Sequence, residues 1–262
     1  MRLLIVIPAY NEEESLPALL DECRAASADL PCDVDVVVVD DDSTDATAAI
    51  AEAKGVRVLK LCRNLGIGGA VQAGLRLAHR EAFDFAVQID GDGQHPPHEI
   101  ARLLARTREA EVPDLVVGSR RLELRGHQTT SARLAGQAWL RFWLRLICRL
   151  RVTDPTSGFR LYGPRALHIF QDTYPYDFPE PEALAVASAV RLRVVEEPVA
   201  MRARQGGRSS ISGFKSLYYM VKVTLAVALA FVRNVRRHAM VAASAAGQQL
   251  EIRQGEHKVN NG

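Results

Sequence analysis

The first 120 residues alternate between short apolar runs and segments with helical spacing, and this alternation restricts the fold more than any other feature of the 262-residue chain. The apolar runs are rich in valine, isoleucine and leucine, which is typical of strands buried on both faces. We predict strands in the segments 3–8, 33–41, 56–61, 83–90 and 114–120. We predict helices between them, in the segments 12–26, 43–54, 68–82 and 97–108. Strands that alternate with helices in this way indicate an α/β fold with a mostly parallel central sheet and helices on both faces.

The pattern changes after Arg121. The segment at about 132–150 carries large apolar residues on one side of the expected helix, at Trp139, Phe142, Trp143, Leu146 and Ile147. Arginines recur beside them at multiples of four residues, at Arg133, Arg141, Arg145 and Arg149. Such a basic amphipathic helix suits a membrane interface, where the arginines meet anionic headgroups. Packing of the same apolar side in the protein core is the alternative.

The remaining segments predict a helix from about Ala183, a strand within 192–203 and an apolar helix over 213–235. Lys222 interrupts the last helix, and the apolar run that remains is shorter than the about 20 residues that a bilayer requires. Residues 236–262 lose the apolar pattern and are expected to form a mobile tail. We therefore expect one domain over residues 1–212, then the apolar helix and the tail.

Composition excludes several classes of protein. The formal net charge of +2 is too small to indicate bulk binding of nucleic acid, so no nucleic-acid partner is expected. The four cysteines lack Cys-x-x-Cys spacing, which favours reduced thiols over a disulfide framework or a zinc site. The N-terminal apolar run is followed by no small-residue cleavage region, which argues against a signal peptide. These features are typical of a cytoplasmic protein.

Polar residues cluster where the expected strands end. They are Tyr10 to Glu12, Asp40 to Asp42, Asn64, Asp90 to Gln94 and Ser119 to Arg121. Ligands of open α/β sheets bind outside the carboxyl ends of the strands, so this edge is the expected site.

The clearest chemistry lies in the stretch that follows the fourth strand. Asp90 and Asp92 are spaced so that both side chains point the same way on an extended backbone. Gly91 between them lets the chain turn and a ligand approach the backbone. With the amide oxygen of Gln94, they offer the oxygen ligands that Mg²⁺ and Mn²⁺ prefer, and these ions take further ligands from phosphates. We therefore predict a metal ion bound to a diphosphate at this position. The alternative is that both aspartates are ordinary carboxylates of a turn. His95 is expected to support this loop without binding the metal.

Six stretches, considered together, carry a resemblance. They are IVIPAYNEEESL, VVVVDDDSTDAT, QIDGDGQHPP, VVGSR, DPTSGFR and RQGGRSS, in this order within residues 3–212. In them the chain resembles family 2 glycosyltransferases, and among these the polyprenyl-phosphate hexosyltransferases typified by dolichyl-phosphate mannose synthase. The resemblance implies a GT-A fold, a nucleotide-diphosphate sugar donor such as GDP-mannose or a UDP-hexose, and inverting transfer to a lipid phosphate.

The resemblance also assigns the donor site. The nucleotide would contact residues at the ends of the first strands, namely Pro8, Tyr10, Glu12, Val39, Asp41, Asp90 and Gly91. Asp90, Asp92 and Gln94 would hold Mg²⁺ or Mn²⁺ on the diphosphate, which places Asp92 among the catalytic residues.

On the acceptor side, the resemblance implies that Arg120, Arg133 and Ser209 bind the lipid phosphate. Arg204 would neutralise donor or acceptor phosphates, so Arg120 and Arg204 join Asp92 as expected catalytic residues. Arginine suits these roles because its planar guanidinium holds two phosphate oxygens and keeps its proton. A solvated surface charge is the alternative for each arginine.

We therefore predict a glycosyltransferase that moves a hexose to a polyprenyl phosphate while bound peripherally to the inner face of the cell membrane. A transferase acting on a sugar hydroxyl is the first alternative, because Glu180 or Glu182 could remove the proton that such an acceptor carries. Helix-start carboxylates exposed to solvent are the simpler interpretation of these two residues. The aspartate usual in hydroxyl-type relatives is absent here, which favours the phosphate acceptor. A non-catalytic protein that binds nucleotide sugars is the second alternative.

Overall fold

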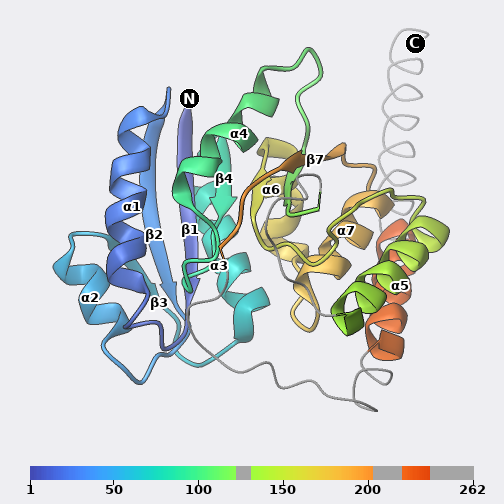
Figure 1. Ribbon diagram of the computed structural model, residues 1–262, viewed down its shortest axis with the longest axis horizontal. Helices are drawn as coiled ribbons and strands as arrows, with labels where there is room; N and C mark the ends of the chain where they lie inside the picture. The colour runs from blue at the N-terminus through green and yellow to red at the C-terminus, as the bar shows by residue number, and fades with distance from the viewer. Residues whose placement is uncertain (122–130, 203–219, 237–262) are drawn as a thin grey trace, which may run out of the picture.

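The computed structural model describes residues 1–121, 131–202 and 220–236, with the backbone alone for residues 131–133. Its described part contains a seven-stranded sheet in the order β3-β2-β1-β4-β6-β5-β7 (Figure 1). The strands are β1 (Arg2–Ala9), β2 (Asp33–Asp40), β3 (Arg57–Lys60), β4 (Phe85–Gln88), β5 (Leu115–Ser119), β6 (Arg160–Tyr162) and β7 (Val194–Pro198).

Within this sheet, β6 is antiparallel to both of its neighbours, β4 and β5, whereas the other pairs are parallel. The parallel strands therefore end at one edge, and the expected mostly parallel α/β sheet is confirmed. The buried valine and isoleucine runs of β1 and β2 explain this arrangement, because strands covered on both faces need apolar side chains at every position.

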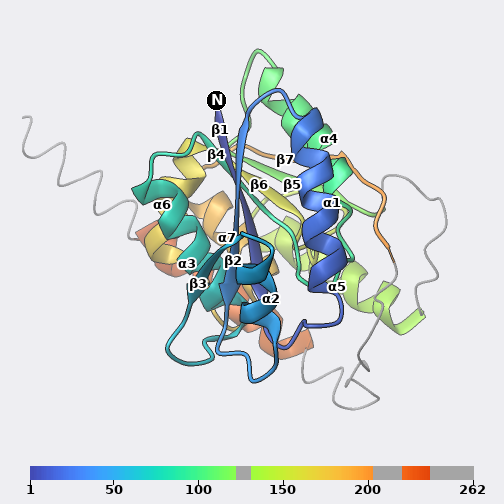
Figure 2. The same ribbon diagram turned by 90° about the vertical axis from the view of Figure 1, so that its left-hand side faces the viewer.

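The helices of the described residues cover both faces of the sheet. They are α1 (Leu16–Asp29), α2 (Thr47–Ala53), α3 (Gly66–Arg80), α4 (Ile100–Ala105), α5 (Ser131–Ile147), α6 (Pro164–Thr173) and α7 (Pro179–Ala189), with 3₁₀ turns η1 (Pro97–Glu99) and η2 (Arg106–Arg108) around α4. Residues 220–236 are also helical. Helices α1 and α4 lie on one side of the sheet, and α3 and α6 lie on the other (Figure 2). The core on the first side contains side chains of α1, α2 and α4, and the other core contains side chains of α3, α5, α6, α7 and helix 220–236.

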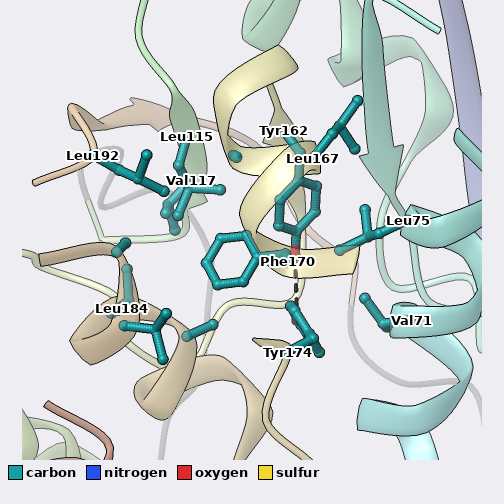
Figure 3. Packing of buried hydrophobic residues seen from close by; sticks show 14 of the residues in the cluster. Val71, Leu75, Leu115, Val117, Tyr162, Leu167, Phe170, Tyr174, Leu184 and Leu192 are labelled. Atoms are coloured by element: carbon teal, nitrogen blue, oxygen red, sulfur yellow. Dashed lines mark hydrogen bonds between the residues drawn. The ribbon is translucent and has the colours of Figure 1, made fainter. Parts of the chain in front are cut away.

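The larger core has an aromatic centre (Figure 3). Tyr162 of β6, Phe170 of α6 and Tyr174 are packed edge to face and are at most 2% exposed. Each ring buries a large apolar area, and the two hydroxyl groups need hydrogen-bond partners inside the core.

Two of the sequence predictions need correction. Strand β6 and helix α6 were not predicted, since DPTSGFRLYGP gives only four residues between glycines for a strand. Helix α7 begins at Pro179 rather than near Ala183, because proline is well tolerated in the first turn of a helix. Of the apolar helix expected over 213–235, residues 213–219 lie outside the described residues, as does the expected tail from residue 237 onward.

Helix α5 has the apolar side that its sequence predicts, and part of that side faces outward, while Trp143 and Ile147 are half-buried. Phe142 and Leu146 are 59% and 60% exposed, while Leu140 and Leu144 face the core. The core-packing alternative is therefore wrong for Phe142 and Leu146. Trp139 Nε1 donates a hydrogen bond of 2.9 Å to Thr224 Oγ1, which joins α5 to helix 220–236.

Helix 220–236 has a similar exposed stripe. Leu225 and Leu229 are 59% and 61% exposed, and Val232 is 46% exposed. In the part of the chain that the structure describes, no helix has the length and hydropathy needed to cross a membrane.

Candidate active site

The residues predicted at the strand ends converge because β2, β1 and β4 are parallel neighbours. They surround a cavity of about 350 Å³. Its lining residues are Pro8, Ala9, Tyr10, Glu12, Asp41, Ile67, Ala70, Asp90, Gly91, Asp92 and Gln94. Every predicted donor and metal residue lies in this set except Val39, whose side chain is fully buried in the core.

Asp41 connects the end of β2 to the start of α3. Its Oδ1 accepts a hydrogen bond of 2.7 Å from the backbone N–H of Leu65. Burial raises the pKa of Asp41, although the backbone hydrogen bonds from Leu65 and Gly66 oppose that rise. The carboxylate thereby fixes the loop that brings Ile67 into the cavity.

The loops after β1 and β2 hold each other in place. Asn11 and Asp42 adopt left-handed backbone conformations, with φ of 54° and 64°, which asparagine and aspartate tolerate better than most residues. Asn11 Oδ1 accepts a hydrogen bond of 2.8 Å from the backbone N–H of Thr44. Glu12 is tied in as well, because its backbone N–H donates to Thr47 Oγ1 at 2.8 Å.

The acidic pair follows β4 in a tight loop. The left-handed turn falls on Gly93, with φ of 73°, rather than on Gly91. A Cβ at Gly91 would lie 3.1 Å from the carbonyl oxygen of Pro8, so the glycine lets this loop lie close to the end of β1. Gln94 contacts Asp92 twice, because its backbone N–H donates at 3.1 Å and its side-chain amide nitrogen also donates to the carboxylate.

Asp90 is held from several sides. Its backbone N–H donates to His95 Nδ1 at 3.0 Å, so this ring nitrogen carries no proton. The His95 ring is 4% exposed and stacks on Phe159, with 5.2 Å between the ring centroids. A Cβ at Gly158 would lie 3.1 Å from both carboxylate oxygens of Asp90, so this carboxylate lies against bare backbone.

The donor set fits a hard divalent cation better than a soft one. Asp90 and Asp92 offer carboxylate oxygens to the cavity. Among the described residues, no group of three or more His, Cys, Asp or Glu side chains is placed to hold a metal ion. A cation here would therefore need further oxygen ligands, which Mg²⁺ and Mn²⁺ usually take from water and phosphate.

Arg120 lies beyond the acidic pair at the end of β5, in a buried ion pair. Its Nε and Nη2 donate to Asp154 Oδ2 and Oδ1 at 2.7 and 2.8 Å, and Nη2 also donates to Thr156 Oγ1 at 3.1 Å. Burial acts to raise the pKa of Asp154, yet the hydrogen bonds and charge of Arg120 hold it below its usual value. Burial acts to lower the pKa of Arg120, and Asp154 raises it. From the sequence we expect this guanidinium to bind two phosphate oxygens at once. One edge of it already binds Asp154, so that edge is not available to a phosphate.

Glu180 and Glu182, at the start of α7, are half-buried rather than exposed. Glu182 Oε1 accepts a hydrogen bond of 3.0 Å from the backbone N–H of Phe178, which caps the helix. Burial raises the pKa of Glu180, while the charge of Arg160 acts to lower it. The two carboxylates therefore differ in role. Glu182 binds the backbone at the start of α7, whereas Glu180 does not accept that hydrogen bond.

Four further residues cannot be placed in this geometry. Arg204, Gly207 and Ser209 lie outside the described residues, and the side chain of Arg133 does as well. Their assignments stay predictions from the sequence.

Comparison with known proteins assigns the sequence to a family. The model of "Glycosyl transferase family 2" matches residues 4–165. The chain belongs to glycosyl transferase family 2. It is 35% identical to an undecaprenyl-phosphate mannosyltransferase of Micrococcus luteus, over 81% of this chain and 88% of that protein. It is 29% identical to a polyprenol monophosphomannose synthase of Mycolicibacterium smegmatis, over 85% of each chain.

Solved structures show the same fold. Glucosyl-3-phosphoglycerate synthase from Mycobacterium tuberculosis, solved in complex with Mn²⁺, UDP and phosphoglyceric acid, superposes with a TM-score of 0.66. That match covers 87% of this chain and 78% of the other at 22% identity. The predicted GT-A fold is confirmed, and the chain is a glycosyltransferase. This result sets aside the alternative of a non-catalytic binding protein.

Sequence reasoning missed two sets of residues in this glycosyltransferase. Ile67 and Ala70 line the cavity from α3, and the glycine-rich start of that helix was the available signal. Asp154 was quoted within a motif but given no partner, although it pairs with Arg120 across 34 residues of sequence. Nothing in the local sequence around Asp154 indicates that its partner is Arg120, because the two residues are far apart along the chain.

Proposed function

We propose that this glycosyltransferase moves a hexose from a nucleotide-diphosphate sugar to a polyprenyl phosphate, with inversion, in a reaction that depends on Mg²⁺ or Mn²⁺. The observation that carries the proposal is the cavity at the strand ends, which brings both carboxylates of the acidic pair together with the expected nucleotide contacts. The names of the two bacterial relatives, which cover most of the chain, support the lipid-phosphate acceptor. The identity of the base and the sugar depends on the shape of the occupied cavity.

On the donor side, Asp90 and Asp92 would hold the divalent cation, and Gln94 would orient Asp92 or add a ligand through its amide oxygen. When bound, such an ion neutralises the negative charge that develops on a departing diphosphate. Asp41 and Tyr10 also line the cavity, where they can contact the nucleoside.

On the acceptor side, Arg120 presents a cation whose orientation Asp154 fixes. Asp154 and Thr156 bind Nε and Nη2 of Arg120, which leaves Nη1 as the edge that can meet a phosphate oxygen. Arg133, Arg204 and Ser209 complete the proposed acceptor site. A phosphate acceptor is already ionised near neutral pH, so it needs no general base.

The exposed apolar stripes of α5 and helix 220–236 support attachment to a membrane surface. We define them as Phe142 and Leu146 on α5, and Leu225, Leu229 and Val232 on helix 220–236. Large exposed apolar side chains on amphipathic helices insert into the headgroup boundary, and nearby arginines bind anionic lipids. A peripheral enzyme on the cytoplasmic face of the cell membrane would meet both a soluble nucleotide sugar and a lipid acceptor.

The decisive experiment incubates the protein with a panel of nucleotide sugars, Mn²⁺ and polyprenyl phosphate, and weighs the lipid product by mass spectrometry. The wild-type protein is expected to add one hexose to the lipid phosphate, and the Asp92→Asn variant is expected to lose that metal-dependent transfer. Asp29→Asn, at the exposed end of α1, is the matched control and should keep full activity. Full activity of Asp92→Asn would contradict the assignment of the acidic pair.

A sugar hydroxyl remains the second candidate acceptor, and one observation favours it. The half-buried position of Glu180 raises its pKa by disfavouring the charged form, which suits a group that accepts a proton near neutral pH. Glu180→Gln should leave transfer to a lipid phosphate intact and should abolish transfer to a hydroxyl. Glu182→Gln is a useful comparison, because loss of the α7 cap should lower stability without selecting between acceptors.

A further inference from the structure

One buried polar side chain behind the acidic pair has no role in the chemistry described so far. Gln88 is the last residue of β4, is 1% exposed, and is surrounded on its strand by apolar neighbours. Burying an amide without hydrogen bonds is costly, so the fold must supply partners for this side chain.

Gln88 has contacts on two sides. Its Nε2 donates to Asp90 Oδ1 at 3.3 Å. Its Oε1 accepts hydrogen bonds from the hydroxyl groups of Tyr162 at 3.1 Å and Tyr174 at 3.5 Å. The two hydroxyl groups are also 3.2 Å apart, which Figure 3 shows as a dashed line in the core.

Chemistry allows one orientation of this amide. The ionised carboxylate of Asp90 can only accept hydrogen bonds, so the NH₂ group of Gln88 must face it. The amide oxygen then faces the tyrosines, whose hydroxyl groups can donate. Burial raises the pKa of both tyrosines, so both keep their protons.

Two neighbours support this contact between Gln88 and Asp90, because Gly158 leaves room for it and His95 holds the backbone of Asp90. The glycine at Gly158 has no side chain, and a Cβ there would lie 3.2 Å from Gln88 Nε2 as well as against both oxygens of Asp90. The backbone of Asp90 is fixed in turn by His95.

We propose that Gln88 is a positioning residue that, with Tyr162 and Tyr174 behind it, orients the Asp90 carboxylate for a divalent cation. This inference rests on the proposed function, since it concerns the metal that the acidic pair would hold. Partners of this kind orient the carboxylates that bind metals, and their loss typically weakens metal binding about 10–100-fold.

The test measures Mn²⁺ affinity without turnover, from the electron paramagnetic resonance signal of free Mn²⁺ in the presence of GDP or UDP. Gln88→Met keeps the length and volume of the side chain and removes its hydrogen bonds. We expect it to raise the Kd for Mn²⁺ about tenfold or more. Transfer activity should return when Mn²⁺ is raised in proportion. A purely structural role would lower the melting temperature and leave the Kd unchanged.

Two further variants keep the test decisive. Tyr162→Phe combined with Tyr174→Phe keeps the aromatic core and removes both hydroxyl groups, and we expect a smaller rise in Kd, about threefold. Gln72→Met is the matched control, because Gln72 is 6% exposed on α3 and accepts a hydrogen bond from Tyr176 instead. It should change stability and leave the Kd for Mn²⁺ at the wild-type value.

The outcomes separate this inference from the proposed function. If wild-type protein binds Mn²⁺ and Gln88→Met binds it equally well, the positioning role is wrong and the proposed function stands. If Gln88→Met fails to fold, the double tyrosine variant decides, and an unchanged Kd overturns the inference. If wild-type protein binds no Mn²⁺ with either nucleotide, the metal dependence in the proposed function fails first.

Discussion

At the scale of single residues, the pair of Arg120 and Asp154 links the site to its support. Asp154 is fully buried and accepts a bidentate hydrogen bond, while its backbone N–H donates to Glu196 Oε1 at 2.9 Å. Glu196 lies on β7, which pairs with β5. Strand β7 therefore holds the loop at Asp154, and Asp154 in turn orients Arg120. An arginine that meets phosphate in the acceptor site would therefore arrive already oriented, at a smaller cost in side-chain entropy.

This pair predicts a specific dependence of stability on pH. Because the pKa of Asp154 is lower in the folded protein than in the unfolded chain, its ionised form stabilises the fold. That stabilisation is complete above the unfolded pKa of about 3.9 and is lost as the pH falls through the lower folded value. Asp154→Asn should lower the free energy of unfolding by about 3–5 kcal/mol at neutral pH, since it leaves Arg120 buried without its counter-charge.

Urea unfolding of both proteins between neutral and strongly acidic pH checks this prediction. The difference between wild type and Asp154→Asn should shrink as the pH falls. Asp172→Asn serves as the control, because Asp172 and Arg76 form an exposed pair with side chains 62% and 59% exposed. Its effect should stay below about 1 kcal/mol. A constant difference between wild type and Asp154→Asn at all pH values would contradict the assignment of the pair.

At the scale of helices and strands, α3 packs closely on β1. A Cβ at Gly74 would lie 2.2 Å from Cγ1 of Val6, so the glycine sets how near the helix lies to the sheet. Val6 belongs to the strand that leads to Pro8 and Tyr10, and α3 leads back to Ile67 and Ala70 in the cavity wall.

Gly74→Ala should therefore lower the free energy of unfolding by about 1–3 kcal/mol, because the added methyl group forces α3 away from β1. Gly136→Ala in α5 is the matched control, since the nearest atom to its added Cβ is Met220 Sδ at 4.0 Å. That control should be neutral or more stable by up to about 1 kcal/mol, as alanine is the better helix former. Equal stability of the two variants in urea would show that α3 moves away from β1 without cost.

The sequence predicts a helix or strand well where the repeat of its apolar residues is enough to identify it. It predicts a strand poorly where the strand forms only by pairing with strands far away along the chain. The first five strands follow from apolar runs bounded by turns, and all five are present. Strand β6 has three residues, one of them Arg160, and it is a strand because β4 and β5 pair with it on either side. The same limit applies to the site. The spacing of Asp90 and Asp92 is visible in the sequence, whereas the partners of Gln88 in the core and of Asp154 at the site lie far away along the chain.

At the scale of the whole molecule, the donor site and the apolar stripes belong to different parts of the structure. The donor cavity lies at the ends of β1, β2 and β4, whereas α5 and helix 220–236 lie toward the other side of the molecule (Figure 1). Arg120 is electrostatically coupled to Asp90 and Glu180, so the proposed acceptor site adjoins the donor site. A lipid phosphate held at Arg120 would lie within the field of the acidic pair, and its polyprenyl chain would extend away from that charge.

If the apolar stripes attach the protein to a membrane, replacing their residues should weaken binding to vesicles without lowering the stability of the fold. Replacing Phe142 and Leu146 with serine, and separately Leu225 and Leu229, should weaken sedimentation with anionic vesicles more than tenfold, because each inserted side chain contributes about 1.5–3 kcal/mol. Thermal unfolding should hardly change, since all four side chains are exposed in the folded protein. Val112→Ser is the control, because Val112 is 48% exposed but belongs to neither helix. Raised salt should weaken vesicle binding of the wild type and of all these variants, because each keeps its surface arginines. Wild-type sedimentation of both double variants would show that the stripes do not bind the membrane.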